Sequence, residues 1–243
     1  MRNIERIAIE KSTGKTFLVK DLDQEFHTGE DIIAKKLLQK EGLISSSKGK
    51  EYLVLKPQFS DLWNSLQRGP QIMIQKDIGL ILAKTGINRD SVVVDAGGGS
   101  GSLCLSLANI CGKITVYETN PEHYALLTKN VSLFGLKNML LKQENVYEGI
   151  SEQELDLITL DLPEPWLALN SAEQALRCGG HIVVYLPNLH QVKKYIDAAK
   201  KTAIKVLEII ELLERKWNID DKIMRPEFAM LGHTGFMVFC RKF

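Results

Sequence analysis

The chain has 243 residues, of which 44% are hydrophobic and 25% are charged, and its formal net charge is +1 at pH 7. This composition is typical of globular domains, and no apolar run approaches the roughly 18 residues of a membrane span, so membrane-spanning, collagen-like and disordered classes are excluded. A nearly neutral chain also lacks a global attraction for nucleic acid, so such a partner would need a local basic patch.

Residues 1–57 predict a small β-rich domain. Three short segments have the composition and alternation of strands, namely IERIAIEK, KTFLVKD and EYLVLKP. Turn-forming pairs stand between them, at Thr13-Gly14, Thr28-Gly29 and Lys48-Gly49. Residues 31–39 have a helical period and predict one short helix. We therefore expect a small barrel or sandwich, followed by a linker at Pro57.

From residue 58 onward, helical and strand patterns alternate. The strand candidates SVVVD, KITVYE, LDLITLD and HIVVYLPN are separated by amphipathic helical segments such as PEHYALLTKNVSLFG. This alternation predicts a mostly parallel sheet with right-handed crossovers and helices on both faces. The last two candidates, KVLEIIELLE and HTGFMVFCRK, can form a hairpin across residues 215–232. That ending favours seven strands over a six-stranded dinucleotide-binding fold, and we expect one domain over residues 58–243.

A glycine-rich loop follows the predicted buried strand at residues 92–94. Asp95 stands at the carboxyl end of this strand, and glycines follow at positions 97, 99 and 101 before a helix begins. Glycine permits a tight turn and lets a ligand approach the backbone closely. The pattern therefore predicts a ligand-binding crevice at this strand end.

Two familiar phosphate-binding motifs do not fit this loop or the rest of the chain. A dinucleotide-binding loop needs G-x-G-x-x-G/A, but the sixth residue is Ser102 when counted from Gly97 and Cys104 when counted from Gly99. A Walker loop fails because an isoleucine stands where the first glycine belongs ahead of the only Gly-Lys-Thr. A different nucleotide-binding pattern is therefore needed to explain the loop.

The remaining pattern, D-x-G-x-G-x-G, resembles motif I of the class I S-adenosylmethionine-dependent methyltransferases. Glu118 ends the next predicted strand, 17 residues after Gly101, where a carboxylate can accept both ribose hydroxyls of an adenosine. The resemblance implies S-adenosyl-L-methionine as the cofactor, with Asn145 at a position that is usually acidic. The cofactor-binding residues that it implies are Asp95, Gly97, Gly99, Ser100, Gly101, Ser102, Leu103, Glu118, His123, Asn145 and Asp161.

A second motif, Asp-Leu-Pro-Glu-Pro-Trp at residues 161–166, follows the predicted strand LDLITLD. Its two prolines fix the backbone on either side of Glu164 and remove two amide donors, so the loop holds Asp161 and Trp166 rigidly at the cleft mouth. The [DN]-P-P-[YF] motif of exocyclic-amine methyltransferases has a different spacing. The loop instead resembles the D-[VL]-P-[DE]-P-W motif of the tRNA adenine-N1 methyltransferases, which methylate the T-loop adenine at tRNA position 58.

Further segments resemble the archaeal and bacterial homo-oligomeric members of that family. They are Arg68-Gly69-Pro70-Gln71, Lys76-Asp77, Val116-Tyr117-Glu118, Arg225-Pro226 and Gly232-His233-Thr234-Gly235-Phe236. The chain departs from the family at Ile74-Gln75, where Tyr or His followed by Pro is usual, and at Ala229, where Arg is frequent. The resemblance implies an α/β fold, a Rossmann-like seven-stranded class I methyltransferase sheet with a small N-terminal β domain.

The same resemblance implies methyl transfer to adenine N1 in tRNA, with Asp161 as the catalytic residue. N1 carries a free lone pair at neutral pH and needs no general base, so catalysis rests on positioning and electrostatics. Asp161 would accept a hydrogen bond from the adenine amino group and favour the cationic product. The substrate-binding residues that the resemblance implies are Arg68, Lys76, Trp166, Arg225 and His233. It also implies a homo-oligomer, most simply a tetramer, in which neighbouring subunits assemble a wide basic surface.

Two other functions stay open at this point. A class I methyltransferase acting on a small molecule or a protein would fit the neutral charge, and a non-catalytic paralogous subunit would fit the missing aromatic residue at Ile74. The first residues form no apolar stretch of signal-peptide length, and the four cysteines show no C-x-x-C spacing. We therefore expect free thiols, no metal site, no membrane association and a cytoplasmic protein.

Overall fold

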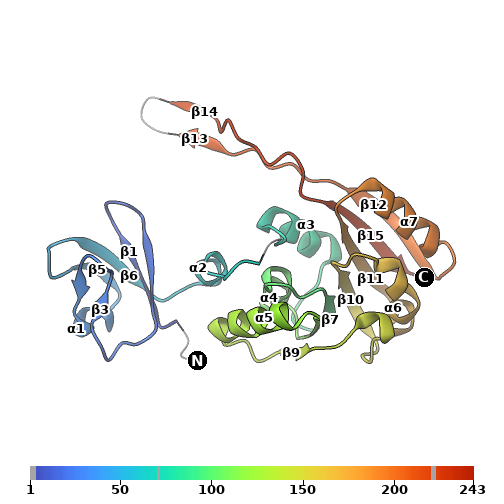
Figure 1. The fold of residues 1–243 in the computed structure, drawn as a ribbon, viewed down its shortest axis with the longest axis horizontal. Coiled ribbons are helices and arrows are strands. Elements are labelled where there is room, and N and C mark those ends of the chain that lie inside the picture. Colours follow the sequence, from blue (N-terminus) through green and yellow to red (C-terminus); the bar gives the residue numbers. More distant parts are fainter. Residues whose placement is uncertain (1–3, 70–71, 220–222) are drawn as a thin grey trace. The chain divides into compact units, whose positions relative to one another are not determined.

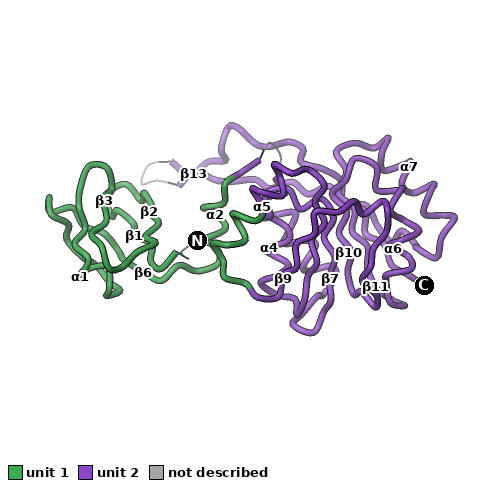
Figure 2. The backbone as a smooth tube through the Cα atoms, turned by 60° about the horizontal axis from the view of Figure 1, so that its bottom comes forward, with its two compact units in different colours: residues 1–67, 128–136 green, residues 68–127, 137–243 purple. Residues whose placement is uncertain are grey.

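The computed structural model describes residues 4–69, 72–219 and 223–243. The chain divides into two compact units, which Figure 2 colours separately. Unit 1 comprises residues 1–67 and 128–136, and unit 2 comprises residues 68–127 and 137–243. The domain boundary expected between residues 57 and 58 stays a prediction.

Unit 1 is built on a four-stranded antiparallel sheet in the order β2-β1-β6-β5. Its strands are β1 (Arg6–Glu10), β2 (Thr16–Val19), β5 (Gly42–Ser45) and β6 (Glu51–Leu55). A two-stranded ladder, β3 (Phe26–His27) with β4 (Ile32–Ile33), and the helices α1 (Lys35–Leu38) and α2 (Phe59–Asn64) complete the elements before residue 67. The buried core consists of Ala8, Val19, Ile33, Leu38, Tyr52 and Val54.

The helix expected over residues 31–39 is shorter than predicted. Only α1 forms, because Ile32 and Ile33 pair as strand β4 with β3. Both are β-branched residues, which favour strands. The helical period of the segment was therefore overridden by a local strand pairing.

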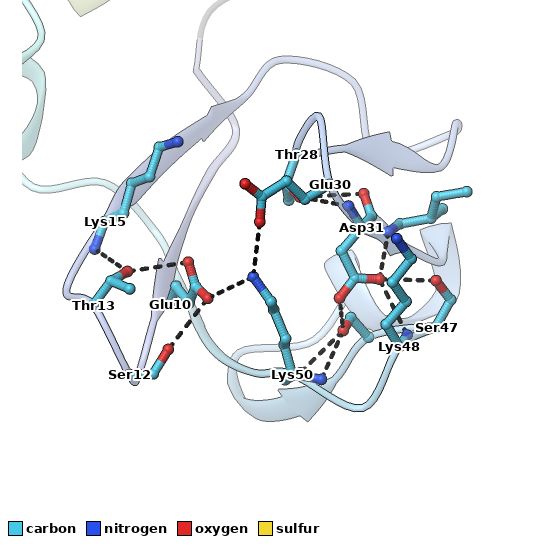
Figure 3. Close-up of polar contacts among 12 residues, drawn as sticks. Glu10, Ser12, Thr13, Lys15, Thr28, Glu30, Asp31, Ser47, Lys48 and Lys50 are labelled. Atoms are coloured by element: carbon cyan, nitrogen blue, oxygen red, sulfur yellow. Dashed lines mark hydrogen bonds and ion pairs between the residues drawn. The ribbon is translucent and has the colours of Figure 1, made fainter.

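Asp31 organises the polar interior of unit 1 (Figure 3). Its Oδ1 accepts hydrogen bonds from the backbone amides of Ile32 (2.7 Å) and Lys48 (3.1 Å) and from the Ser47 hydroxyl (2.9 Å), and the Ser46 hydroxyl donates to Oδ2. Burial acts to raise the pKa of Asp31, but these donors outweigh it and lower the pKa to about 2. One carboxylate thus ties β4 to the turn between β5 and β6.

Lys50 connects a second part of the same unit (Figure 3). Its Nζ lies 3.0 Å from Oε1 of Glu10, at the end of β1, and 3.2 Å from Oε2 of Glu30. Glu10 is buried and also accepts hydrogen bonds from the hydroxyls of Ser12 and Thr13. The ion pair thus joins the hairpin of β1 and β2 to the turn ahead of β6, and the hydroxyl contacts hold Glu10 to the turn of its own hairpin.

Unit 2 contains the seven-stranded sheet, in the order β12-β15-β11-β10-β7-β8-β9. Its strands are β7 (Val92–Ala96), β8 (Lys113–Tyr117), β9 (Met139–Lys142), β10 (Leu155–Leu160), β11 (Leu176–Leu186), β12 (Ile204–Ile210) and β15 (Phe236–Lys242). Strands β9, β8, β7, β10 and β11 pair in parallel, and β15 runs antiparallel to both β11 and β12. The prediction of a mostly parallel sheet that ends in a hairpin is therefore confirmed.

Helices cover both faces of this sheet (Figure 1). The helices that begin after residue 68 are α3 (Gln75–Thr85), α4 (Ser102–Ala108), α5 (Pro121–Phe134), α6 (Leu169–Ala175) and α7 (Leu189–Ala199), with 3-10 turns η1 (Val146–Glu148) and η2 (Pro165–Ala168). Helices α3 and α4 lie on one face, and α6 and α7 lie on the other. Between β12 and β15 the chain forms an extended arm, in which β13 (Trp217–Ile219) pairs with β14 (Met224–Pro226).

No helix in the described part of the chain combines the length and the apolar character that crossing a bilayer requires.

The main core of unit 2 fills the space beneath α6 and α7. It includes Leu155, Ile158, Ile182, Val184 and Val238, all of which are completely buried strand residues. These packed strands hold the ends of β7, β8 and β10 at fixed positions.

Candidate functional site

Three acidic residues meet where adjacent parallel strands end. Asp95 is near the carboxyl end of β7, Glu118 directly follows β8, and Asp161 directly follows β10. Because β7 pairs with both β8 and β10, these ends share one edge of the sheet. The Asp161 amide donates to the Ala96 carbonyl, 2.9 Å away. This edge is where open α/β sheets bind ligands.

The glycine loop follows β7 and packs directly against the neighbouring loop. Gly97, Gly99 and Gly101 all have positive φ values, of 92°, 51° and 92°. A Cβ atom on Gly97 would lie 3.0 Å from the carbonyl carbon of Asp161 and closer still to its oxygen. Glycine at position 97 is therefore needed both for the backbone conformation and for the contact with Asp161.

Glu118 holds the glycine loop in place. Its Oε2 accepts the Gly99 amide at 2.9 Å and its Oε1 accepts the Asn120 amide at 2.8 Å. Each carboxylate oxygen can accept a second hydrogen bond, so these contacts leave acceptor capacity for a ligand. His123 lies beside it, with Nδ1 4.0 Å from Oε2 of Glu118.

A cavity of about 230 Å³ opens at this edge of the sheet. It brings together three predicted cofactor-binding residues, Gly97, Glu118 and Asn145. The remaining lining residues are Tyr117, Thr119, Glu144, Val146, Tyr147, Leu162, Pro163 and Glu164. The last three belong to the 161–166 loop, so one cavity is bounded by both sequence motifs.

The other predicted cofactor-binding residues surround this cavity without lining it. Ser100, Ser102 and Leu103 are buried at the start of α4. Asn145, which does line the cavity, caps η1 with its side chain, because its Oδ1 accepts the Tyr147 amide at 3.0 Å. A direct cofactor contact for each of these residues stays a prediction.

Asp95 is buried beneath the loop rather than exposed in the cavity. Only 1% of its surface is accessible, and its Oδ1 accepts a hydrogen bond from the Thr159 hydroxyl. Burial raises the pKa of Asp95 to about 7; the Thr159 hydrogen bond opposes this shift, and the charges of Asp161 and Glu118 add to it. Asp95 therefore lies beneath the glycine loop, and its predicted contact with the cofactor stays a prediction.

Asp161 is exposed on one side and surrounded by protein atoms on the others. Its residue surface is accessible, yet desolvation by the atoms around it raises the pKa of its carboxyl to about 6. The carboxyl is thus mostly ionised at pH 7 and still accessible to a ligand. Trp166, in the same loop, packs against the core, and Nζ of Lys194 lies 4.1 Å from its ring centroid.

Lys76 is engaged in a buried network, and its predicted contact with phosphates stays a prediction. Its Nζ donates to Oδ1 of Asp77 (2.6 Å), to the Leu212 carbonyl (2.6 Å) and to the Thr234 hydroxyl (2.8 Å). All three ammonium protons therefore have acceptors, and only 6% of the side chain is exposed. Lys76 binds the two ends of the arm segment to α3 instead of reaching outward.

Tyr185 completes this network and was not identified from the sequence. Its hydroxyl donates to Oδ2 of Asp77 at 3.1 Å and also pairs with the Thr234 hydroxyl. Burial raises the pKa of Tyr185, and the charges of Asp77 and Asp161 raise it further, so the hydroxyl stays protonated. The one signal in the sequence was Asp77, an acidic residue on the apolar face of a predicted helix, because a buried carboxylate needs hydrogen-bond donors such as Tyr185.

The other predicted substrate-binding residues occupy different environments. His233 uses both ring nitrogens, because Nδ1 contacts Oε1 of Glu211 and Nε2 lies 2.8 Å from the Pro187 carbonyl. The hydrogen bond with Glu211, followed by that with Pro187, raises the pKa of His233. Arg68 is exposed at the start of unit 2. Pro70 and Gln71, quoted above for the family resemblance, lie outside the described residues.

A second cavity of about 230 Å³ lies where the arm joins unit 2. It is lined by Ile74, Lys76, Glu214, Arg215, Lys216, Glu227, Ala229, Met230 and Leu231. Ile74 and Ala229 are two of the positions at which the sequence departs from the family pattern. Both departures thus fall in one cavity, whereas Arg225 lies farther along the arm, with its guanidinium 4.0 Å from the Phe228 ring centroid.

Comparisons with known proteins support the resemblance seen in the motifs. A family model described as "tRNA methyltransferase complex GCD14 subunit" matches residues 52–227. The tRNA (adenine(57)-N(1)/adenine(58)-N(1))-methyltransferase TrmI of Methanocaldococcus jannaschii is 32% identical, over 94% of this chain and 92% of that protein.

Two solved structures are similar over 100% of this chain. The SAM-dependent O-methyltransferase from Thermotoga maritima has a TM-score of 0.85 at 27% identity, with 94% of that chain covered. The tRNA (m1A58) methyltransferase TrmI from Aquifex aeolicus has a TM-score of 0.80 at 25% identity, with 98% covered. The expected class I methyltransferase fold is confirmed, and the chain belongs to the family described as the tRNA methyltransferase complex GCD14 subunit.

Proposed function

We propose that this protein transfers a methyl group from S-adenosyl-L-methionine to N1 of the T-loop adenine at position 58 of tRNA. The observation that carries the proposal is the contact between the two motif loops. Asp161 opens the Asp-Leu-Pro-Glu-Pro-Trp loop, and its carbonyl lies against Gly97 of the glycine loop. A group bound at the glycine loop and a base beside Asp161 would therefore be neighbours.

The residues at the first cavity fit S-adenosylmethionine in their chemistry. Glu118 has acceptor capacity for ribose hydroxyls, and Asn145 offers an amide for the adenine edge. Gly97 presents a backbone free of side chain toward the same cavity. When bound, S-adenosylmethionine supplies the electrophilic methyl group.

In this proposal Asp161 acts on the target base by position and charge. The adenine N1 lone pair needs no proton removed, so no general base is required. The Asp161 carboxylate accepts a hydrogen bond from the exocyclic amino group and stabilises the positive charge that develops on the ring. The adenine leaves its contacts in the T-loop to reach this position, as enzymes that act on bases require.

The proposed partners are tRNA and further copies of the chain, in a cytoplasmic homotetramer. The arm supports self-association because it exposes large apolar side chains: Trp217 is 55% exposed, Ile219 69%, Met224 74% and Phe228 90%. Apolar surface of this kind is usually covered by a partner. Light scattering that returned a particle of 27.3 kDa at assay concentration would contradict the tetramer.

The function is tested with labelled S-adenosylmethionine and an unmodified tRNA transcript. We expect label in the transcript, with 1-methyladenine mapped to position 58, and no label at that position when another base replaces the adenine. Transfer only to a small molecule or protein would favour the alternative methyltransferase. Cofactor binding without transfer to any acceptor would identify a non-catalytic subunit.

The role proposed for Glu118 has its own test. Glu118→Ala removes two charge-assisted hydrogen bonds to the ribose, and we expect it to weaken cofactor binding by about 2 to 4 kcal/mol. Glu118→Gln retains one acceptor oxygen, and its cofactor affinity should lie between those of the wild-type protein and Glu118→Ala. Calorimetry showing equal affinity in all three proteins would remove Glu118 from the cofactor site.

A further inference from the structure

The backbone of the 161–166 loop has few hydrogen-bond donors of its own. Pro163 and Pro165 have no amide proton, so the Glu164 amide is the one donor between them. That amide donates to the hydroxyl oxygen of Tyr147, 3.2 Å away. A single side chain from η1 therefore holds the middle of the loop.

A second side chain holds the loop from α7. Nε2 of Gln191 donates to the Pro163 carbonyl at 2.9 Å. The Gln191 amide is itself oriented, because its Oε1 accepts from Nδ2 of Asn188 at 2.6 Å. Since the oxygen of this amide faces Asn188, its NH₂ group is directed to the loop.

Tyr147 also belongs to the wall of the first cavity. Tyr147 and Asn145 line it together with Glu118, and Asn145 fixes η1 by accepting the Tyr147 amide. The Tyr147 ring is half-buried and packs against the core of unit 2. The packing of the ring therefore fixes the position of the Tyr147 hydroxyl, which accepts the hydrogen bond from the Glu164 amide.

We propose that Tyr147 and Gln191 are positioning residues, which hold the 161–166 loop so that Asp161 keeps its place against Gly97. The inference rests on the proposed function in one respect, that Asp161 acts on the reacting base. Neither residue touches the reacting atoms. Both act through the loop, Tyr147 on the Glu164 amide and Gln191 on the carbonyl of the preceding residue.

The test is a double-mutant cycle between Tyr147→Phe and Asp161→Ala. Tyr147→Phe keeps the packed ring and removes the acceptor, and we expect single-turnover methyl transfer to fall about 10-fold or more, since small misplacements of reacting groups are costly. In the Asp161→Ala background the same change should lower the rate by less than about 2-fold. Equal loss in both backgrounds would mean that Tyr147 has only a structural role.

A matched control and a second loop variant complete the design. Tyr195→Phe removes a hydroxyl from a completely buried tyrosine of α7 in the core of unit 2, and the rate should stay within about 2-fold of wild type. Gln191→Leu keeps the side-chain size and should behave as Tyr147→Phe does. A normal rate for both Tyr147→Phe and Gln191→Leu would overturn the proposal.

Hydrogen exchange at the Glu164 amide tests the inference without any activity measurement. We expect the amide to be protected in the wild-type protein and to exchange about 10-fold faster or more in Tyr147→Phe. An unprotected Glu164 amide in the wild-type protein would refute the proposal even if tRNA methylation is established. Conversely, a protein that methylates no tRNA yet shows this protection refutes the proposed function and leaves the loop contact intact.

Discussion

Gly97 lies against the main-chain carbonyl of Asp161, in a contact that leaves no room for a Cβ atom. The two residues are 64 positions apart in the sequence and come from the ends of the adjacent parallel strands β7 and β10. Gly97 is the first glycine of one of the two motifs that carry the family resemblance, and Asp161 opens the other. The structure therefore joins the proposed cofactor loop and the proposed substrate loop through direct backbone contact.

Gly97→Ala should disturb both loops at once. The added methyl group must displace the Asp161 carbonyl, and residue 97 has a φ of 92°, which alanine adopts only with strain. We expect methyl transfer to fall at least about 100-fold, as for a displacement near 1 Å. Gly86→Ala is the control, because Gly86 has a φ of 62° with nothing within 4 Å of its Cβ position. If both variants lost activity equally, backbone strain alone would explain the effect.

Lys76→Met should lower stability rather than affinity for tRNA. It would leave the Asp77 carboxylate, which is 0% exposed, without its cation, and breaking a buried ion pair in this way costs about 3 to 5 kcal/mol. Denaturant titration measures this loss. Lys84→Met, in an exposed pair with Glu208, should cost less than about 1 kcal/mol. A Lys76→Met protein of unchanged stability that binds tRNA more weakly and with less salt dependence would support the predicted contact of Lys76 with phosphates.

The mostly parallel pairing of the sheet, its closing hairpin and the position of both motif loops could be predicted from the sequence, because each depends on local patterns. Alternating helices and strands predict the parallel sheet, and strand ends place Glu118 and Asp161 at one edge. The network of Lys76 could not be predicted in this way. Its partners Leu212 and Thr234 lie 136 and 158 residues away, and Tyr185 lies 108 residues from Asp77. Only the tertiary fold brings them together.

The pairing of strand β4 was missed for a related reason. Residues 31–39 have a helical period, yet Ile32 and Ile33 join Phe26 and His27 in a ladder. The Asp31 carboxylate accepts the amide of Ile32 and also the Ser47 hydroxyl and the Lys48 amide, so it ties the start of that strand to a distant turn. A side-chain contact across the fold thus decided between two locally acceptable conformations.

Asp95 should make stability depend on pH. Its pKa is about 7 in the folded protein against 3.8 as the ordinary value, so between these pH values the folded state binds a proton that the unfolded state releases. The free energy of unfolding should therefore fall as the pH rises from about 4 to about 7. Denaturant titrations of wild type and Asp95→Asn at pH 5 and pH 8 should show the variant gaining relative stability at pH 8. A difference that does not change with pH would contradict the raised pKa.

Asp31→Asn should loosen unit 1. An amide cannot accept the four hydrogen bonds that the carboxylate receives, and the pKa of about 2 keeps Asp31 ionised, so its contribution is lost only as the pH falls from about 4 through about 2. Hydrogen exchange should accelerate in the peptides that contain β3 to β6. The exposed residue Asp23 provides the control, as Asp23→Asn. Unchanged exchange in Asp31→Asn would show that the carboxylate is dispensable.

The central claim is that the Asp161 carboxylate acts on the target adenine, and single-turnover methylation of tRNA by Asp161→Ala tests it most directly. We expect a rate at least about 100-fold lower, with S-adenosylmethionine affinity changed by less than about 3-fold. Because the pKa of Asp161 is about 6, the wild-type rate should rise as the pH increases through about 6, and the remaining rate of Asp161→Asn should not. Near-normal turnover in Asp161→Ala, or failure of that variant to bind the cofactor, would contradict the claim.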